Sequence, residues 1–158
     1  MFVLVRVVTY ASIFIGLVLI YVPARLLSWS GIVGPAAIGV EQVAGMIVGT
    51  AGGLVALWSI FSFAFIGKGT PAPFDPPRRL VIQGPYQFVR DPMYIGAGFA
   101  IAGPALFYKS WVLLMYVGLF LLITHLFVIW YEEPTLRRTF GHEYEVYCLR
   151  IGRWWPRL

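Results

Sequence analysis

The sequence predicts an all-α membrane protein with about four transmembrane helices, a cytoplasmic proline-rich loop and an amphipathic helical tail at the C-terminus. Three observations support this fold class. Of the 158 residues, 59% are hydrophobic and only 12% are charged, which lies well outside the average for soluble domains. The apolar residues fall into four stretches, and the basic residues gather at one set of their ends. The chain is therefore expected to form one membrane domain over residues 1–158.

The first two spans occupy the N-terminal part, residues 1–66. Phe2–Val22 is long enough to cross about 30 Å of hydrocarbon. A cleaved signal peptide is the alternative, but the stretch exceeds the usual apolar core and lacks a small-residue cleavage site, so a retained span is favoured. In the second span, Val43–Ile66, Gly45, Gly49 and Gly53 recur every four residues, which predicts a face for close helix packing.

The second part of the chain, residues 67–158, contains a loop, two further spans and a tail. The loop segment "GTPAPFDPPRR" holds too many prolines for a helix and is expected to be extended. Tyr94–Phe107 and Trp111–Tyr131 are joined by a tight "YKS" connection and so predict a helical hairpin. The tail has apolar residues at three- and four-residue steps, which suits a helix lying against the membrane or the bundle, with a kink at Gly141. These residues are Leu136, Phe140, Tyr144, Tyr147 and Ile151.

The charge distribution predicts an orientation. Ten of the twelve Lys and Arg residues fall on one side of the spans, and only Arg25 and Lys109 fall on the other. Both termini and the 67–92 loop are therefore expected in the cytoplasm, at a bacterial-type plasma membrane. The net charge of +5 is explained by this bias and by contact with membrane lipids, so no nucleic-acid partner is expected. With a single cysteine, Cys148, neither a disulfide nor a Cys/His metal site is expected.

Two polar segments meet at the cytoplasmic end of the hairpin: "GPYQFVRDPMYIGAG" and "YEEPTLRRTFGHEYEVY". A carboxylate at the bilayer centre costs about 2.5–3.5 kcal/mol, so Glu132 and Glu133 require an interfacial position or a partner. Arg137 or Arg90 could pair with them, and so could a cationic ligand. Gly96-x-Gly98 is open to two readings, a weak phosphate or nucleotide signal and close helix packing.

Together these motifs resemble a family. G-P-Y-x-x-x-R-x-P-x-Y-x-G, a span, E-E, F-G-x-x-Y-x-x-Y and a basic tail with proline are similar to the integral-membrane methyltransferases that include isoprenylcysteine carboxyl methyltransferases and phospholipid N-methyltransferases. The resemblance covers roughly residues 68–156. It implies a multi-span helical fold, S-adenosyl-L-methionine bound at the cytoplasmic face, and a lipophilic small molecule or lipid as methyl acceptor, entering from the bilayer.

The resemblance also implies site residues, position by position. Its cofactor contacts fall on Arg78, Arg79, Leu80, Val81, Tyr86, Asp91, Pro92, Met93, Tyr94, Gly96, Gly98 and Glu132. The catalytic candidates are Arg90, Glu133 and His125. Arg90 could bind a substrate carboxylate or hold the loop in shape. Glu133, His125 or Asp91 could be the base that an amine or thiol acceptor requires. His125 lies two turns before Glu132 on the fourth span, where a helix-to-helix hydrogen bond is the alternative. His142 is expected on the surface.

Two positions depart from the family pattern. Many relatives have histidine where this chain has Asp91, which replaces a donor with a normally anionic acceptor; Asp91 could neutralise Arg90 or the sulfonium charge. Val128 occupies the position at which isoprenylcysteine enzymes carry a substrate-binding arginine, and this weakens carboxyl methylation as the activity. Two alternatives are an NADPH-dependent membrane reductase of related architecture, for which Arg78 and Arg79 could bind a phosphate, and a non-catalytic membrane protein that retains the fold.

Overall fold

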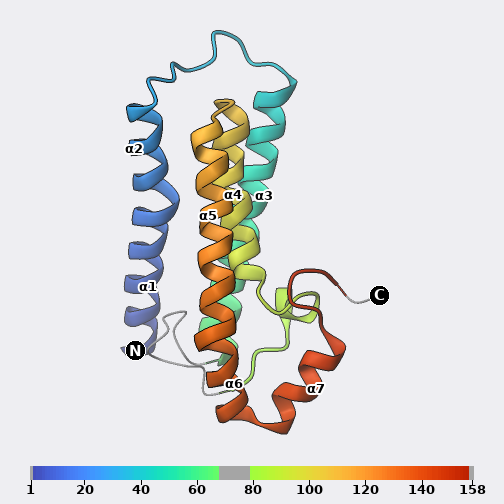
Figure 1. Cartoon of the computed structure of the whole chain (residues 1–158). Helices are drawn as coiled ribbons and strands as arrows, with labels where there is room; N and C mark the ends of the chain where they lie inside the picture. Colours follow the sequence, from blue (N-terminus) through green and yellow to red (C-terminus); the bar gives the residue numbers. More distant parts are fainter. Residues whose placement is uncertain (1, 68–78, 157–158) are drawn as a thin grey trace.

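The computed structural model describes residues 2–67 and 79–156, and the regular elements in those two ranges are all helical (Figure 1). Three helices are long and apolar enough to cross a membrane, over Val8–Trp29, Val40–Gly67 and Trp111–Phe140. The predicted third span corresponds to α4 (Pro92–Phe107), which is apolar but shorter. The chain is therefore an integral membrane protein. The prediction that falls on residues 68–78, an extended proline-rich loop, lies outside the described residues.

Two prolines shape the long helical rods. The first rod comprises α1 (Phe2–Phe14), η1 (Ile15–Tyr21) and α2 (Val22–Trp29), and it extends beyond the predicted end at Val22. Proline lacks an N–H and clashes with the preceding turn, which an α-helix accommodates by widening locally. The π-helical η1 ends two residues before Pro23, and η4 (Val128–Glu132) ends two residues before Pro134. Both prolines are thereby tolerated inside a continuous rod.

Helices α3 (Val40–Ser62) and α4 pack closely through glycines, and η2 (Phe63–Gly67) extends α3. A Cβ atom on Gly103 of α4 would lie 2.4 Å from the Cα of Gly49, and one on Gly45 would lie 2.7 Å from the carbonyl oxygen of Gly103. Such distances leave no room for a side chain at either position. The close approach replaces side-chain packing with backbone contact, as in other membrane helix pairs.

The glycine face differs from the predicted one at a single position. Gly52, and not Gly53, continues the contact surface: a Cβ on Gly52 would lie 2.5 Å from the backbone nitrogen of Ala100, whereas a Cβ on Gly53 would meet nothing within 4 Å. At 3.6 residues per turn, a step of seven residues from Gly45 returns nearly to the same face, while a step of eight rotates well past it. The strict four-residue spacing was therefore wrong for Gly53.

Helix α5 (Trp111–Phe127) runs back along α4 to complete the predicted hairpin, and Ser110 caps it by accepting a hydrogen bond from the backbone N–H of Leu113. The α1–α2 rod lies beside α5 (Figure 1), where the hydroxyl of Tyr116 donates to the carbonyl of Val18 at 3.0 Å. Ala97, Ile101 and Phe120 form the buried core of this part of the bundle.

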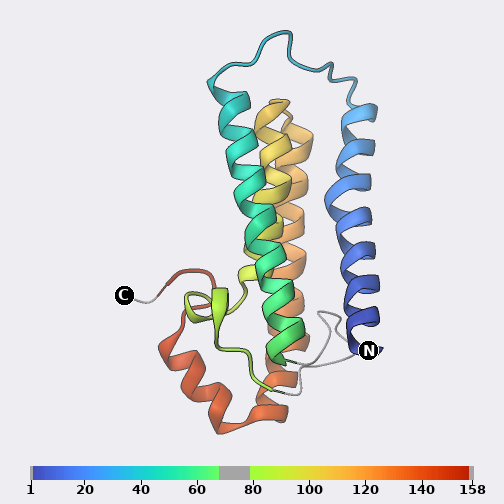
Figure 2. The same ribbon diagram turned by 180° about the vertical axis from the view of Figure 1, so that it is seen from behind.

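One end of the bundle carries the remaining elements. After η4, the rod continues as α6 (Glu133–Phe140), the chain turns at Gly141 with φ of +50°, and α7 (His142–Arg150) leads into a tail that returns to the start of α4. The short helix η3 (Gly84–Gln87) lies there too. The N-terminus is at this end, and the connection between α2 and α3 is at the other (Figures 1 and 2).

The glycine contact makes a testable prediction. Gly52→Ala should destabilise the protein by about 1–3 kcal/mol, because its new methyl group overlaps the backbone of α4. Gly53→Ala is the matched control, one residue away on the same helix, and should be neutral or stabilising by up to about 1 kcal/mol. Equilibrium unfolding in mixed detergent micelles measures both. Equal effects of the two substitutions would contradict this packing.

Candidate functional site

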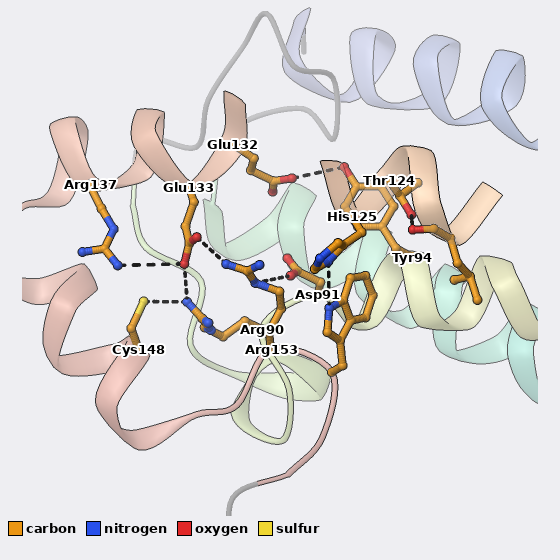
Figure 3. Close-up of polar contacts among 12 residues, drawn as sticks. Arg90, Asp91, Tyr94, Thr124, His125, Glu132, Glu133, Arg137, Cys148 and Arg153 are labelled. Carbon is orange, nitrogen blue, oxygen red and sulfur yellow. Dashed lines mark hydrogen bonds and ion pairs between the residues drawn. The ribbon is translucent and has the colours of Figure 1, made fainter. Parts of the chain in front are cut away.

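Four segments converge at the end of the bundle where α4 begins: the loop with η3, the first turn of α4, the foot of the α5 rod, and the returning tail (Figure 3). Gly84 allows the loop to turn, because it has φ of +65° and a Cβ there would lie 2.7 Å from the Oγ of Ser62. Tyr86 follows and is buried, and its carbonyl accepts a 2.6 Å hydrogen bond from the hydroxyl of Tyr147 on α7. Burial raises the pKa of the Tyr86 phenol, so this group stays neutral.

Arg90 ties the loop to the tail. Its backbone N–H donates to the carbonyl of Gly152 at 3.0 Å, and its guanidinium Nη1 lies 2.8 Å from Glu133 Oε1 and 2.7 Å from the Sγ of Cys148. The Nε atom of Arg90 is buried and has no hydrogen-bond partner within the described residues. A buried donor of this kind costs free energy unless a ligand or water accepts from it.

Glu133 is held between arginines. Arg90 binds one of its carboxylate oxygens and Arg153 of the tail binds the other, while Arg137, one turn along α6, lies 4.0 Å away (Figure 3). Both oxygens of Glu133 therefore accept charge-assisted hydrogen bonds, which are the strong kind. This network fixes the positions of α6, the loop and the tail relative to one another.

Glu132 points away from this network, toward α4 (Figure 3). The hydroxyl of Tyr94 donates to Glu132 Oε2 at 3.2 Å, and Glu132 has no ion pair in the ranges 2–67 and 79–156. The second carboxylate, Asp91, is buried beside Arg153, whose Nε lies 3.9 Å from Asp91 Oδ2. Burial raises the pKa of Asp91 to about 6, against the opposing charges of Arg153 and Arg90.

A narrow cavity joins these groups. It brings together five of the residues expected to contact a cofactor, and Arg90 joins them in its lining. The five are Leu80, Val81, Tyr86, Asp91 and Glu132. Phe63, Leu136, Tyr144 and Tyr147 complete the lining. Two buried carboxylates with only part of their charge compensated make this cavity suitable for a cation.

Other expected contacts lie elsewhere. Met93 packs against the buried Ile60 of α3 and Ala64 of η2, and Pro92 is fully buried at the start of α4. A Cβ on Gly96 would lie 2.5 Å from the backbone nitrogen of Ala56, and one on Gly98 would lie 3.0 Å from a methyl group of Leu121.

Helix packing therefore accounts for both Gly96 and Gly98, the second of the two readings of this motif. Arg79 is exposed, and Arg78 lies outside the described residues.

His125 is separate from the carboxylate cluster. Its Nδ1 accepts a 3.2 Å hydrogen bond from the indole Nε1 of Trp154, and it lines an apolar groove between α4, α5 and the tail. Arg153, Tyr144 and Tyr147 were not predicted as site residues. Sequence reasoning assigned Arg153 to the orientation signal and the two tyrosines to an amphipathic stripe, and nothing in their spacing distinguishes a membrane-facing stripe from a cavity wall.

Comparison with known proteins gives one match. The family model described as phospholipid methyltransferase matches residues 40–143, which include α3, α4, α5, α6 and the cavity residues 80–132. Neither the curated proteins nor the solved structures gave a match. Because the model covers well over half of the chain, including the loop, the hairpin and both glutamates, the protein belongs to the phospholipid methyltransferase family.

Proposed function

We propose that the protein is an S-adenosyl-L-methionine-dependent methyltransferase that acts on a phospholipid at the cytoplasmic face of the membrane. The observation that carries this proposal is Glu132, a carboxylate that lines the cavity opposite Asp91 without an ion pair in the described part of the chain. Such a group stabilises a bound cation, because the ligand supplies the charge partner that is missing among the described residues.

The chemistry of the lining residues suits this cofactor. The cavity has a volume of only about 30 Å³, room for about one water molecule, so binding requires a wider opening between the loop and the tail. The sulfonium and amino groups of the cofactor are cationic and suit Asp91 and Glu132. Its carboxylate suits the Nε–H of Arg90, which has no partner among residues 2–67 and 79–156. Leu80 and Val81 line the same cavity, and their backbone would hold the adenine end. The cofactor supplies an already activated methyl group, so the protein is required mainly to position donor and acceptor.

In this proposal Arg90 and Glu133 are positioning residues. Both oxygens of Glu133 already accept from arginines, so its carboxylate is better suited to holding Arg90 and Arg153 in place than to removing a proton. Asp91, with its pKa near 6 and a place in the cavity, is the better base for an amine acceptor near neutral pH.

The orientation in the membrane follows from the distribution of Lys and Arg residues, and the number of spans follows from the apolar helices. We propose four spans, with α4 inserted as the short third one beside α3 and α5, and with both termini in the cytoplasm. The start of α4, with Asp91 as its N-cap and Tyr94 in its first turn, lies beside the foot of the α5 rod, since Tyr94 donates to Glu132. A phospholipid could then reach the cavity from the bilayer without leaving it.

Glu132→Gln tests the cofactor site. The substitution keeps the shape of the side chain and removes its charge, so binding of S-adenosylmethionine should weaken roughly 10- to 100-fold, the equivalent of a lost charged hydrogen bond. Isothermal titration calorimetry of the detergent-purified protein measures this. Glu143→Gln, an exposed acid on α7, is the matched control and should leave the affinity unchanged.

Tight binding of S-adenosylmethionine by Glu132→Gln would contradict the assigned role of Glu132. Binding of NADPH in its place would move the protein to the reductase class, and a folded wild-type protein that binds neither molecule would indicate a fold retained without the chemistry.

Asp91 predicts a pH dependence. Its carboxyl is anionic above a pKa of about 6 and neutral below it, and the anion favours a cationic ligand. Affinity for S-adenosylmethionine should therefore fall as the pH is lowered from 7 to 5, and Asp91→Asn should remove most of that dependence and bind weakly throughout. Calorimetric titrations at several pH values measure it. A wild-type affinity independent of pH would exclude an anionic contact from Asp91.

A further inference from the structure

A second cavity lies beside the carboxylate cluster and has a different character. It is a groove of about 710 Å³, within the range of pockets that bind small molecules. Gly98 and Ala102 of α4, Leu121 and His125 of α5, and Trp154 and Trp155 of the tail contribute to its lining.

Two further lining side chains, Phe99 and Leu122, are each 54% exposed on the apolar surface of the helices. The groove therefore borders the face that α4 and α5 present to lipid.

The groove and the narrow cavity share a wall of two short segments. In the first, Val89 lines the groove while Arg90 and Asp91, the next two residues, line the cavity. In the second, Trp154 lines the groove while its neighbour Arg153 binds Glu133 and Asp91. The hydrogen bond from Arg90 N–H to Gly152 holds the two segments together. The groove and the carboxylate cluster therefore lie on the two sides of this wall.

His125 gives the groove a single defined polar group. Apart from the indole nitrogens, it contributes the only polar side-chain atoms among the described residues that line the groove. Its Nδ1 accepts from Trp154, so the proton of the neutral ring is on Nε2, which remains able to donate to a ligand. His125 precedes Glu132 by seven residues, which places it roughly 10 Å further along the rod toward the membrane interior.

We propose that this groove holds an acyl chain of the methyl-accepting phospholipid, and that His125 Nε2–H donates a hydrogen bond to the ester carbonyl at the head of that chain. The inference rests on the proposed function. The apolar lining suits the chain, the lipid-facing border gives it a path of entry, and the glycerol and headgroup of a phospholipid can extend from His125 past the shared wall to the cavity.

Photolabelling tests the groove directly. The full-length protein in mixed micelles is irradiated with phosphatidylethanolamine that carries a diazirine on one acyl chain, and the labelled residues are mapped by mass spectrometry. We expect labels concentrated on the groove residues of α4, α5 and the tail. Ala102→Trp should fill the groove, lower this labelling at least about fivefold and raise the KM for phosphatidylethanolamine. Ala51→Trp, at an exposed position on α3, is the matched control and should change neither.

The second arm tests His125. The wild-type KM should be about 2- to 10-fold lower for an ester-linked phosphatidylethanolamine than for its ether-linked analogue, the value of one neutral hydrogen bond. His125→Phe should abolish that difference while its affinity for S-adenosylmethionine stays unchanged. If Ala102→Trp fails to fold, the label map of the wild type and the ester–ether comparison still test the acyl-chain site.

The outcomes separate the two proposals. Labels spread evenly over the lipid-facing helices, or an ester preference that survives in His125→Phe, would overturn the acyl-chain site while binding of S-adenosylmethionine leaves the methyltransferase proposal intact. Absence of S-adenosylmethionine binding to the folded wild type would overturn the proposed function itself.

Discussion

The organisation of this protein depends on how it accommodates buried charge at one end of an apolar bundle. Glu133 is placed between Arg90 of the loop and Arg153 of the tail, so that a single carboxylate connects three parts of the chain that are distant in sequence. Several kcal/mol are required to bury each ion, and pairing offsets this cost only when the geometry is good. The ion pairs of Glu133 therefore require the loop and the tail to lie beside α6, which explains why the tail returns to the start of α4.

The two adjacent glutamates have different surroundings because of the helix that carries them. Pro134 interrupts the regular hydrogen bonding of the α5 rod, and the π-helical η4 precedes it. Glu133 faces the arginines and Glu132 faces Tyr94 and the cavity (Figure 3). The charge of Glu133 is neutralised by the arginines, so Glu133 anchors the structure. Glu132 has no ion pair among the described residues, so it offers a site for a cation. Glu132, a carboxylate without an ion pair in the part of the chain that the structure describes, most distinguishes this end of the bundle from a simple membrane helix cap.

Much of this arrangement could be predicted from the sequence. Apolar stretches predicted the helices, and the tight "YKS" turn predicted the α4–α5 hairpin. The family resemblance named twelve cofactor contacts, five of which line one cavity, and their role stays a prediction. Long-range geometry could not be predicted. The contact face includes Gly52 in place of Gly53, because glycine spacing alone does not show which glycines face the partner helix. Arg153 was predicted only as part of the orientation signal, because its positive charge suits that role and an ion pair equally.

Transfer of a labelled methyl group from S-adenosylmethionine to a phospholipid tests the proposed activity itself. Detergent-purified protein is incubated with phosphatidylethanolamine and S-adenosylmethionine that carries a tritiated methyl group, and the lipids are extracted and counted. We expect label in an N-methylated phospholipid for the wild type and a loss of at least about tenfold for Glu132→Gln, since the substituted side chain lacks the charge that the cofactor requires. A folded wild-type protein that binds S-adenosylmethionine and transfers no label to the lipid would contradict the acceptor, and equal transfer by both proteins would contradict the role of Glu132.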